Sequence, residues 1–181
     1  MDKNKNLYSD LSSRPQWDEY YLTMAFIVAQ RSFDPSSKCG AVIVSKDNRV
    51  LSTGYNGPIK SSNDKEIPLT RPQKYCHMIH GEENSLLAYN GSFQDIQGGT
   101  IYVTGRPCHR CLRMILQKGI TRIVYGPSVT KVVDGSDMEA QEIMIKNRNI
   151  EIKEVDSILI TELLDKTIAY IYSKSKESKN Y

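Results

Sequence analysis

Residues 99–126, GTIYVTGRPCHRCLRMILQKGITRIVYG, contain the signals for a strand, a helix and a second strand in one continuous stretch. The run TIYV predicts the first strand, and RIVY predicts the second. Between them, PCHRCLRMILQK predicts a helix that ends at Gly119, because glycine commonly follows the last helical residue. Strand and helix in alternation are typical of a layered α/β fold.

The rest of the chain continues this alternation. Residues 39–55, CGAVIVSKDNRVLSTGY, predict a hairpin that turns at Asp47 and Asn48. Further helices are expected from Trp17, from about His80, over 137–149 and from residue 157, with a strand over 150–155. These elements predict one sheet covered by helices.

The composition is that of an ordinary globular protein. The 181 residues are 39% hydrophobic and 25% charged, and the net charge of +3 neither requires nor excludes nucleic acid. No apolar run approaches the ~18 residues that span a bilayer, and the start MDKNKNLYSD lacks the apolar segment of a signal peptide. We therefore expect a cytoplasmic protein whose four cysteines are thiols or metal ligands.

Two segments stand apart from this pattern. Residues 56–78 form a long polar connection with three prolines. Connections longer than ~12–15 residues are usually functional or disordered. Near the C-terminus, an apolar stripe predicts a core or subunit contact, and its members are Ile168, Tyr170, Ile171 and Tyr172.

His80 and Glu82 lie two residues apart at an expected helix start. One explanation is structural, a polar helix start with a capping glutamate. The other is that His80 binds a metal and that Glu82 moves protons beside it. On its own, His80 favours the structural explanation.

Cys108 and Cys111 begin the next helix, directly after Pro107. Side chains three residues apart on a helix point the same way, and the helix start stabilises the thiolates that bind zinc. The pair alone is also compatible with a redox function or with chance. With His80 as a third ligand, a tetrahedral Zn²⁺ keeps one position for water, as catalytic sites do, and Glu82 gains a purpose.

The order His-x-Glu followed by Pro-Cys-x-x-Cys is the signature of zinc nucleobase deaminases. The chain resembles the cytidine deaminase superfamily and, within it, the deoxycytidylate (dCMP) deaminases. The resemblance covers most of residues 14–126 and is carried by RPQWDEYYLTMAFIVAQRS, GAVIV, LSTGYNG, HGEEN, IYVTGRPCHRC and KGITRIVYG. It implies a three-layer α/β/α cytidine deaminase-like fold with a mixed sheet of about five strands. We expect one zinc-dependent deaminase domain over 14–172, a disordered N-terminus over 1–13 and a frayed tail over 173–181.

The resemblance also implies a reaction, the hydrolysis of dCMP to dUMP and ammonia. It assigns Zn²⁺ to His80, Cys108 and Cys111, and it makes Glu82 the catalytic proton shuttle. The same family implies a homo-oligomer, commonly a hexamer, with dCTP and dTTP as effectors.

Four residues are candidates for substrate contacts. The family implies that Asn56 reaches the deoxyribose, that Lys38 lies near the phosphate, and that the N–H of Gly81 contacts the base. From the residues alone, Lys38 is equally well a solvated loop lysine, and Asn56 is also typical of a turn with positive φ. Arg106 stands where the family more often has an apolar or small residue, so it meets a phosphate or discriminates a different base.

Other departures from the family bear on specificity. Gly81 replaces the usual alanine, and Cys39 the usual valine. The motif GYNGPIK lacks one residue of the family's GYNG-x-P-x-G. Some relatives carry a second zinc, but Cys39, Cys76 and His77 do not match its pattern, which favours buried thiols and a loop histidine.

Two other functions remain open at this stage. A deaminase of a modified nucleotide or of a base in tRNA shares the zinc motif, but the TGYNG sequence and the small net charge argue against it. A non-catalytic zinc-binding relative would be expected to close its site with four protein ligands, and it would leave Glu82 without a role.

Overall fold

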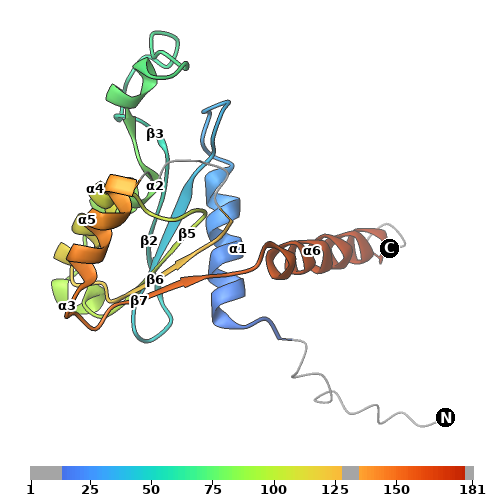
Figure 1. Ribbon diagram of the computed structural model, residues 1–181. Helices are drawn as coiled ribbons and strands as arrows, with labels where there is room; N and C mark the ends of the chain where they lie inside the picture. The colour runs from blue at the N-terminus through green and yellow to red at the C-terminus, as the bar shows by residue number, and fades with distance from the viewer. Residues whose placement is uncertain (1–13, 128–134, 178–181) are drawn as a thin grey trace.

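The computed structural model describes residues 14–127 and 135–177 and is built on one five-stranded sheet (Figure 1). The strand order is β2-β1-β5-β6-β7. The strands are β1 (Gly40–Val44), β2 (Val50–Tyr55), β5 (Thr100–Val103), β6 (Arg122–Tyr125) and β7 (Glu151–Glu154). β1 pairs antiparallel with β2 and β5, whereas β6 pairs parallel with β5 and β7. The predicted mixed sheet of about five strands is confirmed.

Helices cover both faces of this sheet. They are α1 (Trp17–Ala29), α2 (Gly81–Ala88), α3 (Phe93–Ile96), α4 (His109–Gln117), α5 (Gly135–Ile145) and α6 (Ser157–Glu177). In Figure 1, α1 lies on one side of the sheet, and α2, α4 and α5 lie on the other. The three-layer α/β/α arrangement predicted from the sequence is therefore present.

The two faces of β1 explain why both layers form. Ala41 and Ile43 pack into the core under α2 and α4, whereas Val42 and Val44 pack into the core under α1. Side chains alternate between faces along a strand, so an uninterrupted apolar strand must be covered twice. Burying each such valine or isoleucine contributes about 1.5–3 kcal/mol, and this burial holds the sheet that carries the site.

The long polar connection begins and ends at one place. β3 (Gly57–Pro58) pairs antiparallel with β4 (Met78–Ile79), so the two ends of the connection lie side by side. Between them, the chain stands away from the sheet in Figure 1 and contains one short 3₁₀ helix, η2 (Gln73–Cys76). The sequence did not predict this small second sheet.

Several boundaries differ from the expected ones. α5 ends at Ile145, ahead of the predicted Asn149, and Asn147 follows with a φ of 60°, which interrupts a right-handed helix. α4 begins at His109, two residues after Pro107, so that Cys108 is its N-cap. The predicted disordered segment 1–13 lies outside the described residues.

α6 continues to Glu177, so residues 173–177 of the expected frayed tail are helical, and 178–181 lie outside the described residues. Its apolar stripe does not enter the core of this chain, because each member is 55–66% exposed: Ile168, Tyr170, Ile171 and Tyr172. The expected role in the core is therefore wrong for these side chains, and the subunit contact stays a prediction. Within the described ranges, no helix has the length and apolar character needed to traverse a bilayer.

Candidate active site

The start of α2 lies directly against β2. A Cβ added to Gly54 would come within 2.2 Å of the Ser85 backbone nitrogen, so only glycine permits this approach. The Asn84 side chain donates a 2.9 Å hydrogen bond from Nδ2 to the Tyr55 carbonyl and fixes the same contact. His80, the N-cap of α2, is thereby held at one edge of a cavity.

The start of α4 is fixed by α5. The backbone N–H of His109 donates to Asp137 Oδ1 at 2.7 Å, and the His109 ring contacts the same carboxylate. Gln141 is buried and donates from Nε2 to the Pro107 carbonyl at 3.0 Å. These bonds hold the turn that presents Cys108 at the helix start.

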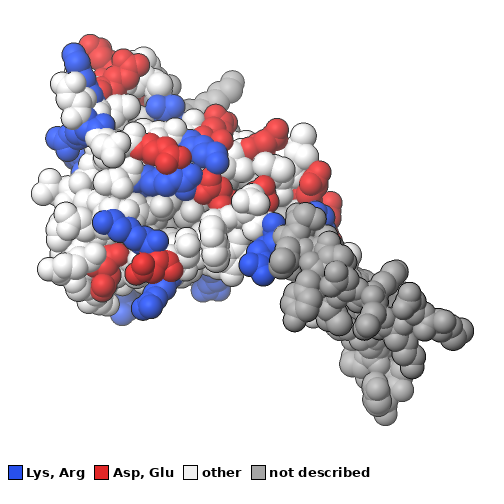
Figure 2. Space-filling view, turned by 90° about the horizontal axis from the view of Figure 1, so that it is seen from below, with Lys and Arg blue, Asp and Glu red and all other residues white. Residues whose placement is uncertain are grey.

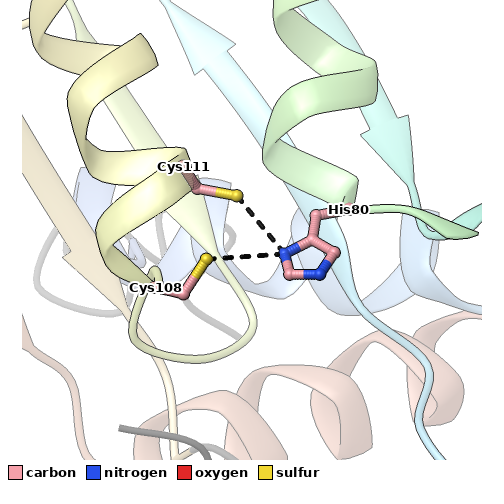
Figure 3. A group of neighbouring side chains, drawn as sticks. All are labelled: His80, Cys108 and Cys111. Carbon is pink, nitrogen blue, oxygen red and sulfur yellow. Dashed lines mark hydrogen bonds between the residues drawn. The ribbon is translucent and has the colours of Figure 1, made fainter. Parts of the chain in front are cut away.

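The two helix starts bring His80, Cys108 and Cys111 together (Figure 3). The Nδ1 of His80 lies 3.7 Å from the sulfur of Cys108 and 3.4 Å from that of Cys111. In tetrahedral coordination, Zn–S bonds of about 2.3 Å and Zn–N bonds of about 2.0–2.1 Å place sulfur and nitrogen about 3.6 Å apart. The donor set and its spacing therefore fit Zn²⁺. No other group of three such ligands occurs within residues 14–127 and 135–177, and Cys76 is exposed.

Hydrogen bonds among these three groups set their protonation. A hydrogen bond from Cys111, supported by His80, lowers the pKa of the Cys108 thiol to about 4. The same contact with Cys108 raises the pKa of the Cys111 thiol. A hydrogen bond to Cys108 raises the pKa of His80 to about 8, although burial opposes this. The lowered pKa of Cys108 favours its thiolate, which is the form that binds a metal.

Glu82, His80 and Cys108 line a common cavity of about 130 Å³, and the buried Cys111 lies behind them. The Glu82 side chain is buried, and burial raises the pKa of its carboxyl above the ordinary value. A buried carboxyl with a raised pKa can both accept and return a proton near neutral pH. The other walls contain Asp34, Ser37, Cys39, Asn56, Arg71, Lys74, Tyr75, Met78, Val103, Thr104, Gly105 and Arg106.

Asn56 lines the cavity, but its amide is engaged within the protein. Its Oδ1 accepts a 2.7 Å hydrogen bond from the Cys39 N–H, and its Nδ2 donates to the Ser37 carbonyl and to Asp34 Oδ2. Asn56 does not have a positive φ, so the turn explanation for this residue does not apply. The Asn56 side chain therefore holds parts of the cavity wall together, in addition to any contact that it makes to a sugar.

The other predicted contact residues divide into two groups. Arg106 lines the cavity, and Gln141 Oε1 accepts a 3.2 Å hydrogen bond from its Nε. Lys38 does not line it, because the Lys38 ammonium turns away to the Gln30 carbonyl at 3.5 Å. Gly81 lies behind the cavity wall, where an added Cβ would meet the Cys39 carbonyl oxygen at 3.1 Å.

Sequence reasoning missed the cavity residues of the long connection. Arg71, Lys74 and Tyr75 come from this segment, which has no periodic pattern to indicate which side chains turn inward. Its length alone marked the segment as functional or disordered. No signal in the sequence singled out Lys74, which is buried.

Comparisons with known proteins agree with this geometry. The cytidine and deoxycytidylate deaminase zinc-binding region family matches residues 15–127. A deoxycytidylate deaminase of Pongo abelii is 35% identical over 116 residues, which cover 61% of this chain and 64% of that protein. A deoxycytidylate deaminase of Mycobacterium phage D29 is 40% identical over 130 residues, covering 62% of this chain and 96% of that protein.

A similar fold occurs in a solved structure. The dCMP deaminase of cyanophage S-TIM5, determined in complex with dCMP and dUMP, is 25% identical and superposes with a TM-score of 0.61. The match covers 78% of this chain and 98% of the phage chain. The cytidine deaminase-like fold expected from the sequence is therefore confirmed.

Proposed function

Because this chain belongs to the cytidine and deoxycytidylate deaminase zinc-binding family, we propose that it deaminates a free deoxycytidine nucleotide, converting dCMP to dUMP and ammonia. The observation that carries this proposal is the close spacing of His80, Cys108 and Cys111, two of which line one cavity with the buried Glu82. The relatives named deoxycytidylate deaminase support the choice of substrate.

The proposed chemistry divides between a metal and one carboxyl group. His80, Cys108 and Cys111 would hold Zn²⁺, which supplies Lewis-acid activation of water near neutral pH. Glu82 moves the protons. Overall, the oxygen of water becomes bonded to C4 of cytosine, and the bond from C4 to the amino nitrogen breaks. One proton of the water ends on N3 and the other on ammonia, and Glu82 carries both.

Two arginines on the cavity walls support a nucleotide substrate over a nucleoside. Arg71 and Arg106 line the cavity and come from different segments. A guanidinium group offers paired donors that match a phosphate. We assign the 5′-phosphate to these arginines and not to Lys38, which does not line the cavity.

An ammonia-release assay with the zinc-loaded protein tests the proposal. dCMP should be turned over faster than deoxycytidine, which has no phosphate for the arginines to bind, and faster than dCTP, whose triphosphate is larger and more highly charged. Glu82→Gln should keep the metal, because residue 82 is not a ligand, and should lose at least about 100-fold in kcat. Zinc binding without ammonia release from any cytosine nucleotide would instead indicate a non-catalytic relative.

Deamination of a base in tRNA finds less support. Binding to nucleic acid needs a basic surface that neutralises several phosphates. The face seen in Figure 2 interleaves basic and acidic side chains, and the net charge is +3. A salt-sensitive gel shift with tRNA would favour this alternative.

We also propose that the protein is a cytoplasmic homo-oligomer, a hexamer with dCTP and dTTP as effectors, as the family implies. The exposed apolar stripe of α6 supports a subunit contact, since Tyr170 and Tyr172 are 64% and 66% exposed. Light scattering gives the oligomeric state, and dCMP saturation curves with and without dCTP test the regulation.

A further inference from the structure

The segment 59–77, which supplies one wall of the cavity, has no apolar anchor of its own. Among these nineteen positions, all of them described, Lys74 is the one buried residue, and it is 2% exposed. Isolated lysines are almost never fully buried unless they are paired. The attachment of this segment to the body of the protein therefore centres on a charged side chain.

The ammonium group of Lys74 is fully bonded. It donates to Asp34 Oδ2 at 2.7 Å, to Asp34 Oδ1 at 2.9 Å and to Ser36 Oγ at 2.7 Å. A lysine has three donors, so none is left over for substrate. Lys74 consequently cannot act as the phosphate ligand that its place in the cavity wall would suggest.

Asp34 links this ion pair to the rest of the cavity wall. Its Oδ1 accepts from the Ser36 hydroxyl at 2.9 Å and from the Ser37 N–H at 3.3 Å, and its Oδ2 accepts from Asn56 at 3.4 Å. The carboxylate thus joins segment 59–77, the loop before β1 and the end of β2. Asp34, Asn56 and Lys74 are the buried members of this network, and bonded polar groups at a buried position favour one arrangement of the parts they join.

Two neighbours of Lys74 reach the cavity. Arg71 and Tyr75 both line it, and the Arg71 guanidinium lies 5.9 Å from the centre of the Tyr75 ring. Tyr75 is 50% exposed. Arg71 lies three residues before Lys74 and Tyr75 directly follows it, so both are close in the chain to the buried ammonium.

We propose that the Lys74–Asp34 ion pair is a positioning pair that docks segment 59–77 on the cavity and thereby presents Arg71 to the phosphate of the nucleotide. This inference rests on the proposed function for the identity of the ligand. Lys74 acts through Arg71 and does not touch the substrate itself.

Product binding provides a test that needs no turnover. Titration calorimetry of the zinc-loaded protein should give a Kd for dUMP that rises at least about 10-fold in Lys74→Met, whereas deoxyuridine affinity stays within about 2-fold. Arg71→Ala should show the same loss, and the double variant should lose no more than Arg71→Ala alone, because both changes remove one interaction. Lys65→Met, which alters an exposed lysine of the same segment, is the matched control and should bind as the wild type.

Limited chymotrypsin digestion tests docking separately. Leu69 and Tyr75 are cleavage sites in the segment and should be cut at least about 10-fold faster in Lys74→Met than in Lys65→Met. Should Lys74→Met not fold, Lys74→Gln tests the same bond with a polar side chain.

Three results would overturn the proposal. The first is cleavage of Lys74→Met at an unchanged rate, and the second is faster cleavage with unchanged dUMP affinity. The third is wild-type protein that binds dUMP no better than deoxyuridine. If dUMP binding and cleavage behaved as expected but the protein released no ammonia, only the proposed reaction would be contradicted.

Discussion

Alanine at Gly54 should displace the helix that carries His80 and Glu82. The added Cβ would lie 2.2 Å from the Ser85 nitrogen and 2.4 Å from the Gly81 carbonyl oxygen, whereas ordinary contacts begin at 3.4 Å. The added Cβ would thus lie 1.2 Å closer to the Ser85 nitrogen than an ordinary contact allows, so α2 and β2 must separate by about 1 Å. Both close atoms belong to backbone, so no side-chain rotation relieves the contact.

A displacement of about 1 Å at a catalytic group costs about 100-fold in rate. We therefore expect kcat/KM for dCMP to fall about 100-fold in Gly54→Ala, which corresponds to about 2.7 kcal/mol of transition-state stabilisation. Overpacking should also lower the free energy of unfolding by about 1–3 kcal/mol. Ammonia release and urea denaturation measure the two effects.

Gly57→Ala is the matched control for this substitution. Gly57 belongs to the same TGYNG motif, but its added Cβ would meet only the Tyr55 ring, at an ordinary 3.8 Å. Activity in Gly57→Ala should stay within about 3-fold of the wild type. If Gly54→Ala retained activity equal to that of Gly57→Ala, the claimed dependence of the site on the β2–α2 approach would be wrong.

Three further substitutions probe the supports of the site and the sheet. Hydrogen bonds from Arg122 and Lys153 hold the pKa of Asp18 well below its usual range. The ionised Asp18 carboxylate therefore stabilises the fold above about pH 4, and this stabilisation is lost as pH falls below that value. Asp18→Asn should therefore cost about 1 kcal/mol at pH 7, after discounting for solvent screening, and urea denaturation should show this gap closing towards pH 3. Gln141→Ala should raise KM for dCMP several-fold by releasing Arg106 and the Pro107 carbonyl, whereas the exposed neighbour Glu142→Ala should not. Cys111→Ser should lose bound zinc in metal analysis and the exposed Cys76→Ser should retain it; equal zinc contents would contradict the assignment of the ligands.

The sequence predicted the elements that follow strong local rules. The sheet and its covering helices follow from alternating apolar runs, and the positions of His80 and Cys108 at helix starts follow from the expected helix boundaries. The strand pairing of β3 with β4 was not predictable, because each has two residues and no pattern.

The substrate side of the cavity was less predictable than the cluster of His80, Cys108 and Cys111. The family resemblance predicted Lys38 near the phosphate, yet its ammonium points to the end of α1. Lys74 is 40 residues from Asp34, and nothing local indicates that they meet. Long-range pairs of charges depend on the folded path of the connection, which composition and periodicity do not specify.

Zinc-edge anomalous diffraction from crystals of the purified protein tests the central claim most directly. We expect one strong peak within about 2.0–2.3 Å of the Nδ1 of His80 and of the sulfurs of Cys108 and Cys111. Glu82 should remain outside bonding distance of that peak. A map without a peak between these three residues, or with the His80 ring turned away from both sulfurs, would contradict the account.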